Sequence, residues 1–237
     1  MRLRLNAFVL LFVVLVAPCF AQSAASVVFS SGAAVIVGND GRSRPVVRGG
    51  EFVAGETIDT VDGRVQLRFL DGASMSLQPG TRFKIEDFRF TAENGKASTE
   101  DRGFFALIKG GFRTITGLIG KEKREQYRVD AVVATIGIRG TDYSAQLGED
   151  GLVLSTFGGL VEVCSGAGCV QVGAGETANV TDRNSRPLLQ GQSGGASGTG
   201  DSMSGSAPPG LPPPPPKVIS PEVAPVRQAP VTGPYNY

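Results

Sequence analysis

The chain has 237 residues, and its 23 basic and 22 acidic side chains give a formal net charge of +1. A charge so near zero gives no electrostatic reason to bind nucleic acid or an anionic membrane surface. The sequence contains no His and no Trp, which excludes Ser-His-Asp and Cys-His nucleophiles and every zinc site that needs a His ligand. We therefore expect no catalytic residue, no metal site, no cofactor and no nucleic-acid partner.

The first 21 residues have the pattern of a secretory signal peptide. Arg2 and Arg4 precede an unbroken apolar run over residues 7–17, and a small residue, Ala21, stands at the expected cleavage position. The run is much shorter than the about 20 apolar residues that span a bilayer, so a retained membrane anchor is the weaker interpretation. We predict cleavage between Ala21 and Gln22, a mature chain without a membrane span, and a periplasmic or secreted location.

Residues 26–187 are predicted to form one all-β domain, a β-sandwich or a β-roll. Short apolar runs alternate with polar residues at a period of two, as in Val65-Leu67-Phe69 and Tyr143-Ala145-Leu147. Asp-Gly pairs, which favour tight hairpin turns, separate the runs. Two segments interrupt this pattern, and we expect residues 93–102 to form an exposed loop and residues 115–124 an irregular crossover.

A sharp bend is predicted where Gly137 and Gly140 flank Ile138-Arg139, directly after the apolar stretch 132–136. Backbone carbonyls at a bend need donors, and the fork of Arg139 offers five. We expect Arg139 to have a structural role, binding backbone carbonyls or a carboxylate. The candidate carboxylates are Asp142, Asp59 and Asp71. The alternative is that Arg139 belongs to a site for an anionic ligand or a partner protein.

An ordered series of short motifs resembles the FecR domain. The most distinctive piece is ATIGIRGTDY over residues 134–143. Its Thr135, Gly137, Arg139, Gly140 and Thr141 are the signature residues, and we expect their role to be structural. The other pieces, in order, are GETIDT (55–60), VQLRFLDGA (65–73), LQPGT (77–81), LIKGG (107–111), YRV (127–129), TFGGLVEV (156–163) and AGE (174–176).

The resemblance implies a role in sensing or binding. FecR proteins of ferric-citrate signalling couple an outer-membrane receptor to a cytoplasmic sigma factor, through a cytoplasmic N-terminal segment and a membrane span. This chain starts with a predicted signal peptide instead, so the resemblance implies the periplasmic binding role and not transmembrane anti-sigma regulation.

Cys164 and Cys169 are predicted to form a disulfide bond. They are the two cysteines that remain after cleavage at Ala21, and export places them in an oxidising compartment. The flanking Val161-Glu162-Val163 and Val170-Gln171-Val172 have the pattern of paired strands, so the two Cα atoms can approach to about 5.5 Å. A zinc site is the rival interpretation, but two thiolates without a His leave the coordination incomplete.

Residues 188–237 are predicted to be a disordered tail, first rich in Gly and Ser and then in Pro, because they contain too little apolar sequence to form a core. Together these features predict a non-catalytic periplasmic binding or sensory module of FecR type. Its partner is expected to be an envelope protein or a ligand that the sequence does not name. The alternative is a structural scaffold of the envelope, with the tail as a tether.

Overall fold

The structure is a computed structural model, and it describes residues 22–92 and 95–190. Its secondary structure is nearly all β, which confirms the predicted fold class. The strands are β1 (Ser23–Ser31), β2 (Val35–Val37), β3 (Ser43–Pro45), β4 (Glu51–Val53), β5 (Thr57–Asp59), β6 (Arg64–Phe69), β7 (Ser74–Leu77), β8 (Arg82–Arg89), β9 (Arg102–Ile115), β10 (Tyr127–Ala131), β11 (Thr135–Gly148), β12 (Gly151–Ser165), β13 (Gly168–Gly173), β14 (Thr177–Val180) and β15 (Leu188–Leu189). One short helix, α1 (Leu118–Glu122), and a 3-10 turn (Arg124–Gln126) complete the set.

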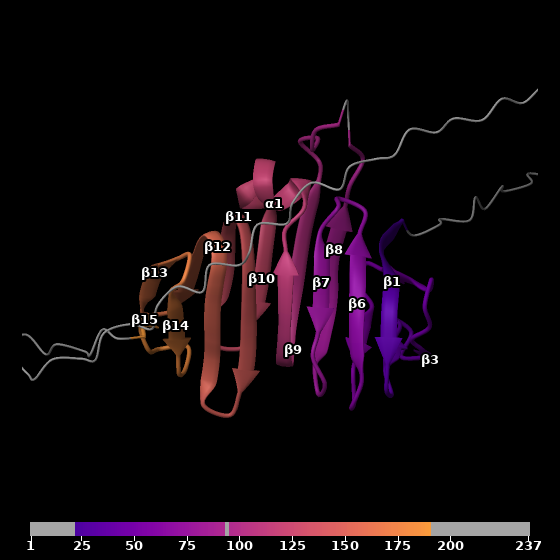
Figure 1. Cartoon of the computed structure of the whole chain (residues 1–237), viewed down its shortest axis with the longest axis horizontal. Helices are drawn as coiled ribbons and strands as arrows, with labels where there is room; N and C mark the ends of the chain where they lie inside the picture. The colour runs from indigo at the N-terminus through magenta and orange to yellow at the C-terminus, as the bar shows by residue number, and fades with distance from the viewer. Residues whose placement is uncertain (1–21, 93–94, 191–237) are drawn as a thin grey trace, which may run out of the picture. The chain divides into compact units, whose positions relative to one another are not determined.

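The strands form two layers that face each other across one core (Figure 1). Layer A contains, in order, β3, β2, β5, β8, the first half of β9, β10, the first half of β11, the second half of β12, and β13. Layer B contains β4, β1, β6, β7, the second halves of β9 and β11, the first half of β12, β14 and β15. Strand pairing is antiparallel throughout, except between β9 and β10.

Aromatic side chains join the two layers. Phe83 of layer A lies edge-on to Phe112 of layer B, with ring centroids 5.5 Å apart, and Phe105 of layer A contacts Phe69 of layer B at 5.4 Å. All four rings are at most 3% exposed. Edge-on aromatic pairs stabilise a core by about 1 kcal/mol beyond their area burial. These contacts show that the predicted alternating strands bury their apolar faces against each other.

Three long strands, β9, β11 and β12, each pass from one layer into the other. The alternation of buried residues shows the passage, because β12 buries even-numbered residues from Leu152 to Thr156 and odd-numbered residues from Val161. A glycine with positive φ stands at each corner: Gly110 at +79°, Gly140 at +62° and Gly159 at +80°. Glycine reaches this region without the penalty that a Cβ imposes. The corners close the two layers into one domain.

The segment after β9 differs from the predicted irregular crossover. Residues 118–122 form helix α1, which lies over one end of the sandwich (Figure 1). Gly120 weakens helix propensity, but its position is tightly packed, because a Cβ there would lie 2.5 Å from Cδ1 of Ile138. The backbone N–H of Leu118 donates to the carbonyl of Asp71, which anchors the start of the helix. Tertiary packing therefore selects the helix that local propensity disfavours.

The strands begin at Ser23 and end at Leu189, slightly outside the predicted range of 26–187. Leu188 and Leu189, which we assigned to the tail, pair with Asn179 and Ala178 of β14. The predicted signal peptide and residues 191–237 of the predicted tail lie outside the described residues. Within residues 22–92 and 95–190, no helix is long and apolar enough to cross a membrane.

Candidate functional site

The bend in the ATIGIRGTDY motif lies at Gly140 and not at Gly137. Gly140 has φ +62°, whereas φ of Gly137 is not positive. The stretch 132–136 is not a continuous strand, because residues 132–134 turn the chain from β10 into β11, and Val132 is 51% exposed. A Cβ at Gly159 of the neighbouring strand would lie 2.2 Å from the carbonyl oxygen of Gly140. The two glycines therefore let the corners of β11 and β12 stack.

Arg139 does not hold this bend, which corrects the prediction from sequence. Its side chain is exposed, and within the described residues it makes no hydrogen bond or ion pair with Asp142, Asp59 or Asp71. Thr116 supplies the polar contacts at the corner: its hydroxyl donates to the carbonyl of Thr141 at 3.2 Å and accepts the N–H of Thr141 at 2.9 Å. Because the neighbouring segment satisfies the backbone, the arginine is free to face solvent.

The corner of β12 turns Phe157 outward. Tyr143 of β11 pairs with Thr156 and Asp142 pairs with Gly158, so Phe157 is an extra residue in β12. Such a β-bulge redirects a side chain, and bulges are common beside functional sites. Phe157 is 51% exposed on the outer face of layer B. A large aromatic side chain is thus held in solvent by the backbone and not by a flexible loop.

Arg113 and Asp142 fix the surroundings of Phe157. Nε and Nη2 of Arg113 donate to the two carboxylate oxygens of Asp142, at 3.0 and 2.9 Å. The guanidinium carbon lies 4.1 Å from the centre of the Phe157 ring, a distance typical of a cation–π contact. The hydrogen bonds from Arg113 to Asp142 raise the pKa of Arg113, so its charge is constant at physiological pH. The result is a rigid cluster with an aromatic ring, a cation and an anion.

We define the Phe157 patch as Arg113, Ile115, Asp142 and Phe157. Ile115 pairs with Asp142 across β9 and β11 and is 54% exposed. The residues beside the patch in the ladders are small and polar, since Ser76 and Ser144 flank Arg113 and Ser74 flanks Ile115. Layer A has a related arrangement, because Arg128 pairs with Asp130 and lies 4.9 Å from the centre of the Phe104 ring, but Phe104 is only partly exposed. The sequence did not reveal the patch, since Arg113 and Ile115 of β9 are far along the chain from Asp142 of β11 and Phe157 of β12.

A second polar cluster lies inside the domain under helix α1. Asp71 is 5% exposed, and its carboxylate accepts the N–H of Ala73 at 3.0 Å. Burial raises the pKa of Asp71, although backbone N–H groups and Lys121 oppose the rise. The buried hydroxyls of Tyr127 and Tyr143 lie 3.2 Å apart, and burial raises the pKa of both phenols. These groups hold the helix and join the layers, so their role is structural.

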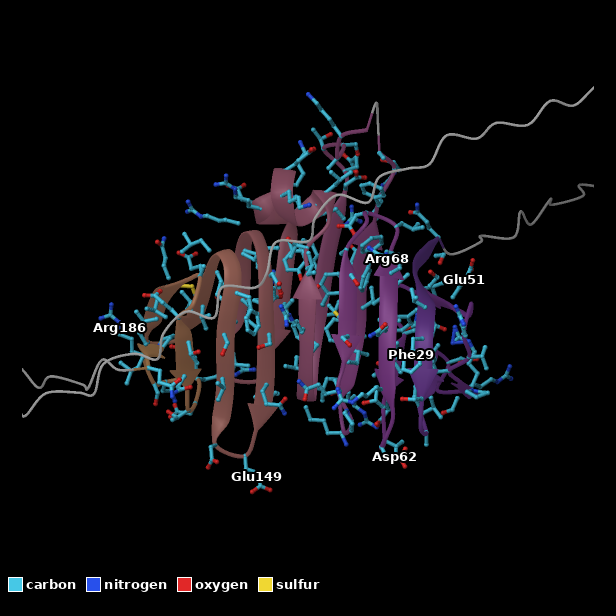
Figure 2. The ribbon with its side chains drawn as sticks, viewed as in Figure 1. Phe29, Glu51, Asp62, Arg68, Glu149 and Arg186 are labelled. Atoms are coloured by element: carbon cyan, nitrogen blue, oxygen red, sulfur yellow. A yellow bond between two sulfur atoms is a disulfide. The ribbon has the colours of Figure 1, made fainter. Side chains whose placement is uncertain are left out.

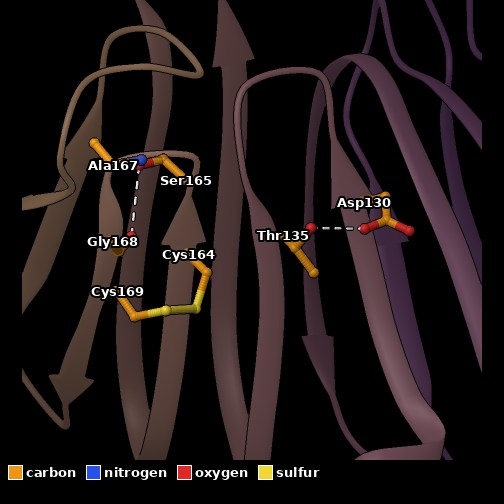
Figure 3. The surroundings of a disulfide bond; sticks show 7 residues. All are labelled: Asp130, Thr135, Cys164, Ser165, Ala167, Gly168 and Cys169. Carbon is orange, nitrogen blue, oxygen red and sulfur yellow. Dashed lines mark hydrogen bonds between the residues drawn. A yellow bond between two sulfur atoms is a disulfide. The ribbon is translucent and has the colours of Figure 1, made fainter.

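The predicted disulfide is present between Cys164 and Cys169 (Figure 3). The two cysteines are direct partners in the β12–β13 ladder, and Gly166-Ala167 form the turn. Their Cα atoms are 4.0 Å apart, closer than the expected 5.5 Å, because the residues stand directly opposite each other on adjacent strands. Nearby, the hydroxyl of Thr135 donates to Asp130 at 2.8 Å (Figure 3). Within the described part of the chain, no group of three or more Cys, Asp or Glu could hold a metal ion.

Replacing both Cys164 and Cys169 by Ser is expected to lower the free energy of unfolding by about 2 kcal/mol, the entropy of so small a closed loop. The domain should still fold, because its aromatic core lies elsewhere. Urea unfolding of the wild type and the double variant gives the difference, and intact-mass measurement with and without reductant confirms the bond. Free thiols in the freshly purified protein would contradict the assignment.

Comparisons with known proteins agree with the sequence motifs. The family model described as "FecR protein" matches residues 56–162, a range that contains the ATIGIRGTDY motif and the Phe157 patch but ends before both cysteines. No curated protein matches the chain.

Two crystal structures, at 1.65 and 2.50 Å resolution, are described as "a putative anti-sigma factor from Parabacteroides distasonis ATCC 8503". Each is 18% identical to this chain, with a TM-score of 0.42 over 56% of this chain and 57% of that one. The chain thus matches little more than half of that protein's length, and so low a TM-score does not establish a shared function. The family model matches residues 56–162, and these residues of the chain are a FecR family domain.

Proposed function

We propose that this protein is a non-catalytic binding module of envelope signalling, exported to the periplasm or secreted, and that it binds a partner protein through the Phe157 patch. The family domain supports a signalling role. The signal-peptide pattern of residues 1–21 supports export. The observation that carries the proposal is the exposed Phe157 ring, fixed by the Arg113–Asp142 pair on the outer face of layer B.

The chemistry of the patch fits a protein partner. Aromatic and Arg side chains are enriched where protein interfaces gain most of their energy, and the small serines around them allow close approach. Because Arg113 is already held by Asp142 and by the ring, little side-chain entropy is lost on binding. The partner should present an apolar group that packs on Phe157 and Ile115, with a polar rim that matches the ion pair.

Affinity capture from the organism's own envelope extract tests the proposal. Phe157→Ala should reduce recovery of the specific partner by about tenfold or more, because Phe157 is the centre of the patch. Phe29→Ala is the matched control, since Phe29 is also an exposed Phe of layer B, at 47% exposure on β1 (Figure 2). It should leave recovery unchanged.

Equal recovery with both variants would show that the patch is not the binding site.

Deleting the gene distinguishes a signalling module from a structural scaffold. A signalling module should change the output of a receptor or sigma-factor system. A scaffold should instead fractionate with insoluble envelope material and leave that output unchanged.

A further inference from the structure

Strand β13 is the least protected edge of the described sheet. It pairs with β12 on one side, and its six residues, Gly168–Gly173, include no charged residue and no proline. The other edges are blunted: β3 contains Arg44 and Pro45, β4 begins with Glu51, and β15 has two residues. Natural proteins use charges, prolines and short lengths to stop edge strands from pairing with other chains. An unprotected edge is therefore a candidate for strand addition.

Among residues 22–92 and 95–190, the backbone groups of β13 that have no partner are those of Cys169 and Gln171. Alternate residues of an antiparallel strand direct N–H and C=O toward the same neighbour. Gly173 belongs to the set that faces away from β12, because its N–H donates to Glu176 and its carbonyl accepts the N–H of Glu176. Cys169 and Gln171 belong to the same set and are exposed. They leave two donors and two acceptors on the edge.

We propose that β13 pairs with β13 of a second copy of this chain, antiparallel and centred on Val170. In this register Cys169 of each copy stands opposite Gln171 of the other, so all the outward donors and acceptors of both residues are satisfied. Val170 is partly buried against the core, and it then faces its own counterpart and extends the core of layer A across the two-fold axis. No like charges stand opposite each other in the paired strands.

The same register brings opposite charges together beside the strands. Arg186 lies beside Gly168. A Cβ added at Gly168 would be 3.8 Å from Nε of Arg186, and Figure 2 shows Arg186 at this edge. Glu176 lies at the other end of β13, where its carboxylate accepts the N–H of Gly173 at 2.6 Å. Antiparallel pairing places Gly168 of one copy next to Gly173 of the other, so Arg186 approaches Glu176 of the second copy. This complementarity favours a second copy over an unrelated strand.

Sedimentation equilibrium of the mature full chain over a range of concentrations tests the proposal. We expect a reversible monomer–dimer equilibrium, with a dissociation constant on the order of micromolar because the contact is small. Gln171→Pro removes one outward donor per copy without removing a hydrogen bond of the hairpin, and it should raise the dissociation constant at least about tenfold. Gln171→Thr, which keeps the N–H and suits a strand, is the matched control and should leave it nearly unchanged.

Arg186→Glu gives an independent test, because this exposed residue can be changed without altering β13. It should weaken the dimer, and added salt should then strengthen association by screening the repulsion from Glu176. A monomer at all concentrations would overturn the proposal, as would a dimer that neither Gln171→Pro nor Arg186→Glu weakens. The proposal does not rest on the Phe157 patch, which lies on the face of layer B, so partner capture and dimerisation can fail separately.

Discussion

Gly159→Ala is expected to lower the free energy of unfolding by about 3 kcal/mol, from two causes. Gly159 has φ +80°, a region that costs an L-residue about 1–2 kcal/mol. The added Cβ would also lie 2.2 Å from the carbonyl oxygen of Gly140 and 3.0 Å from Cγ2 of Thr141. Forcing an atom into a packed site costs about 1–3 kcal/mol more. Because the obstacle is the backbone of the adjacent corner, a side-chain rotation cannot relieve it.

The control is Gly175→Ala. Gly175 has nearly the same backbone conformation, φ +85°, but no atom lies within 4 Å of its Cβ position. Only the conformational cost remains, about 1 kcal/mol. Chemical denaturation of the two variants and the wild type measures both losses. Equal losses would show that the stacking of the β11 and β12 corners adds nothing to the stability of the domain.

Asp71→Ala is expected to lower the free energy of unfolding by about 2 kcal/mol. The substitution removes the side-chain acceptor of the backbone N–H of Ala73, and a buried unsatisfied donor costs about 1–3 kcal/mol. Helix α1 keeps its backbone anchor, because the N–H of Leu118 donates to the main-chain carbonyl of Asp71. Asp71→Asn keeps one side-chain oxygen as an acceptor, so it should be much less destabilising. Thermal unfolding of both variants gives the comparison, and equal losses in both would show that the negative charge, and not the acceptor, matters.

The pH dependence of stability gives a second test of Asp71. Burial raises its pKa above 3.8, so the folded state binds the proton more tightly than the unfolded state. This group's contribution to stability is therefore greatest below the unfolded pKa and falls as pH rises through the interval up to the folded pKa.

Asp101 has the opposite effect on the pH dependence of stability, because its pKa is lowered and not raised. Burial opposes the ionisation of Asp101, but hydrogen bonds from Thr91 and Ser98 outweigh this effect and lower its pKa, so its contribution to stability is lost at acid pH.

The effect of Asp71 is isolated by measuring the free energy of unfolding against pH for the wild type and for Asp71→Asn and subtracting one curve from the other. A difference that does not change from pH 4 to pH 7 would contradict the assigned direction.

The sequence by itself determined the fold class, the disulfide and the FecR domain over residues 56–162. Period-two alternation and Asp-Gly turns depend on neighbouring residues, so the chain shows them directly, and the structure confirms an all-β domain. Cys164 and Cys169 lie close together in sequence on either side of a turn, so neighbouring residues alone were enough to predict that they pair.

Only the tertiary structure decided which strands continue through a bend and which side chains meet. The runs Leu152–Leu154 and Val161–Val163 look like two strands, and they are one strand, because Gly159 turns β12 from layer B into layer A. The donor at the Gly140 corner is Thr116 and not Arg139, and the partner of Asp142 is Arg113. The sequence contains several arginines and carboxylates that could form the same ion pair. Which of them pair depends on the register between strands far apart in the chain, and this register is fixed when the two layers bury their common core.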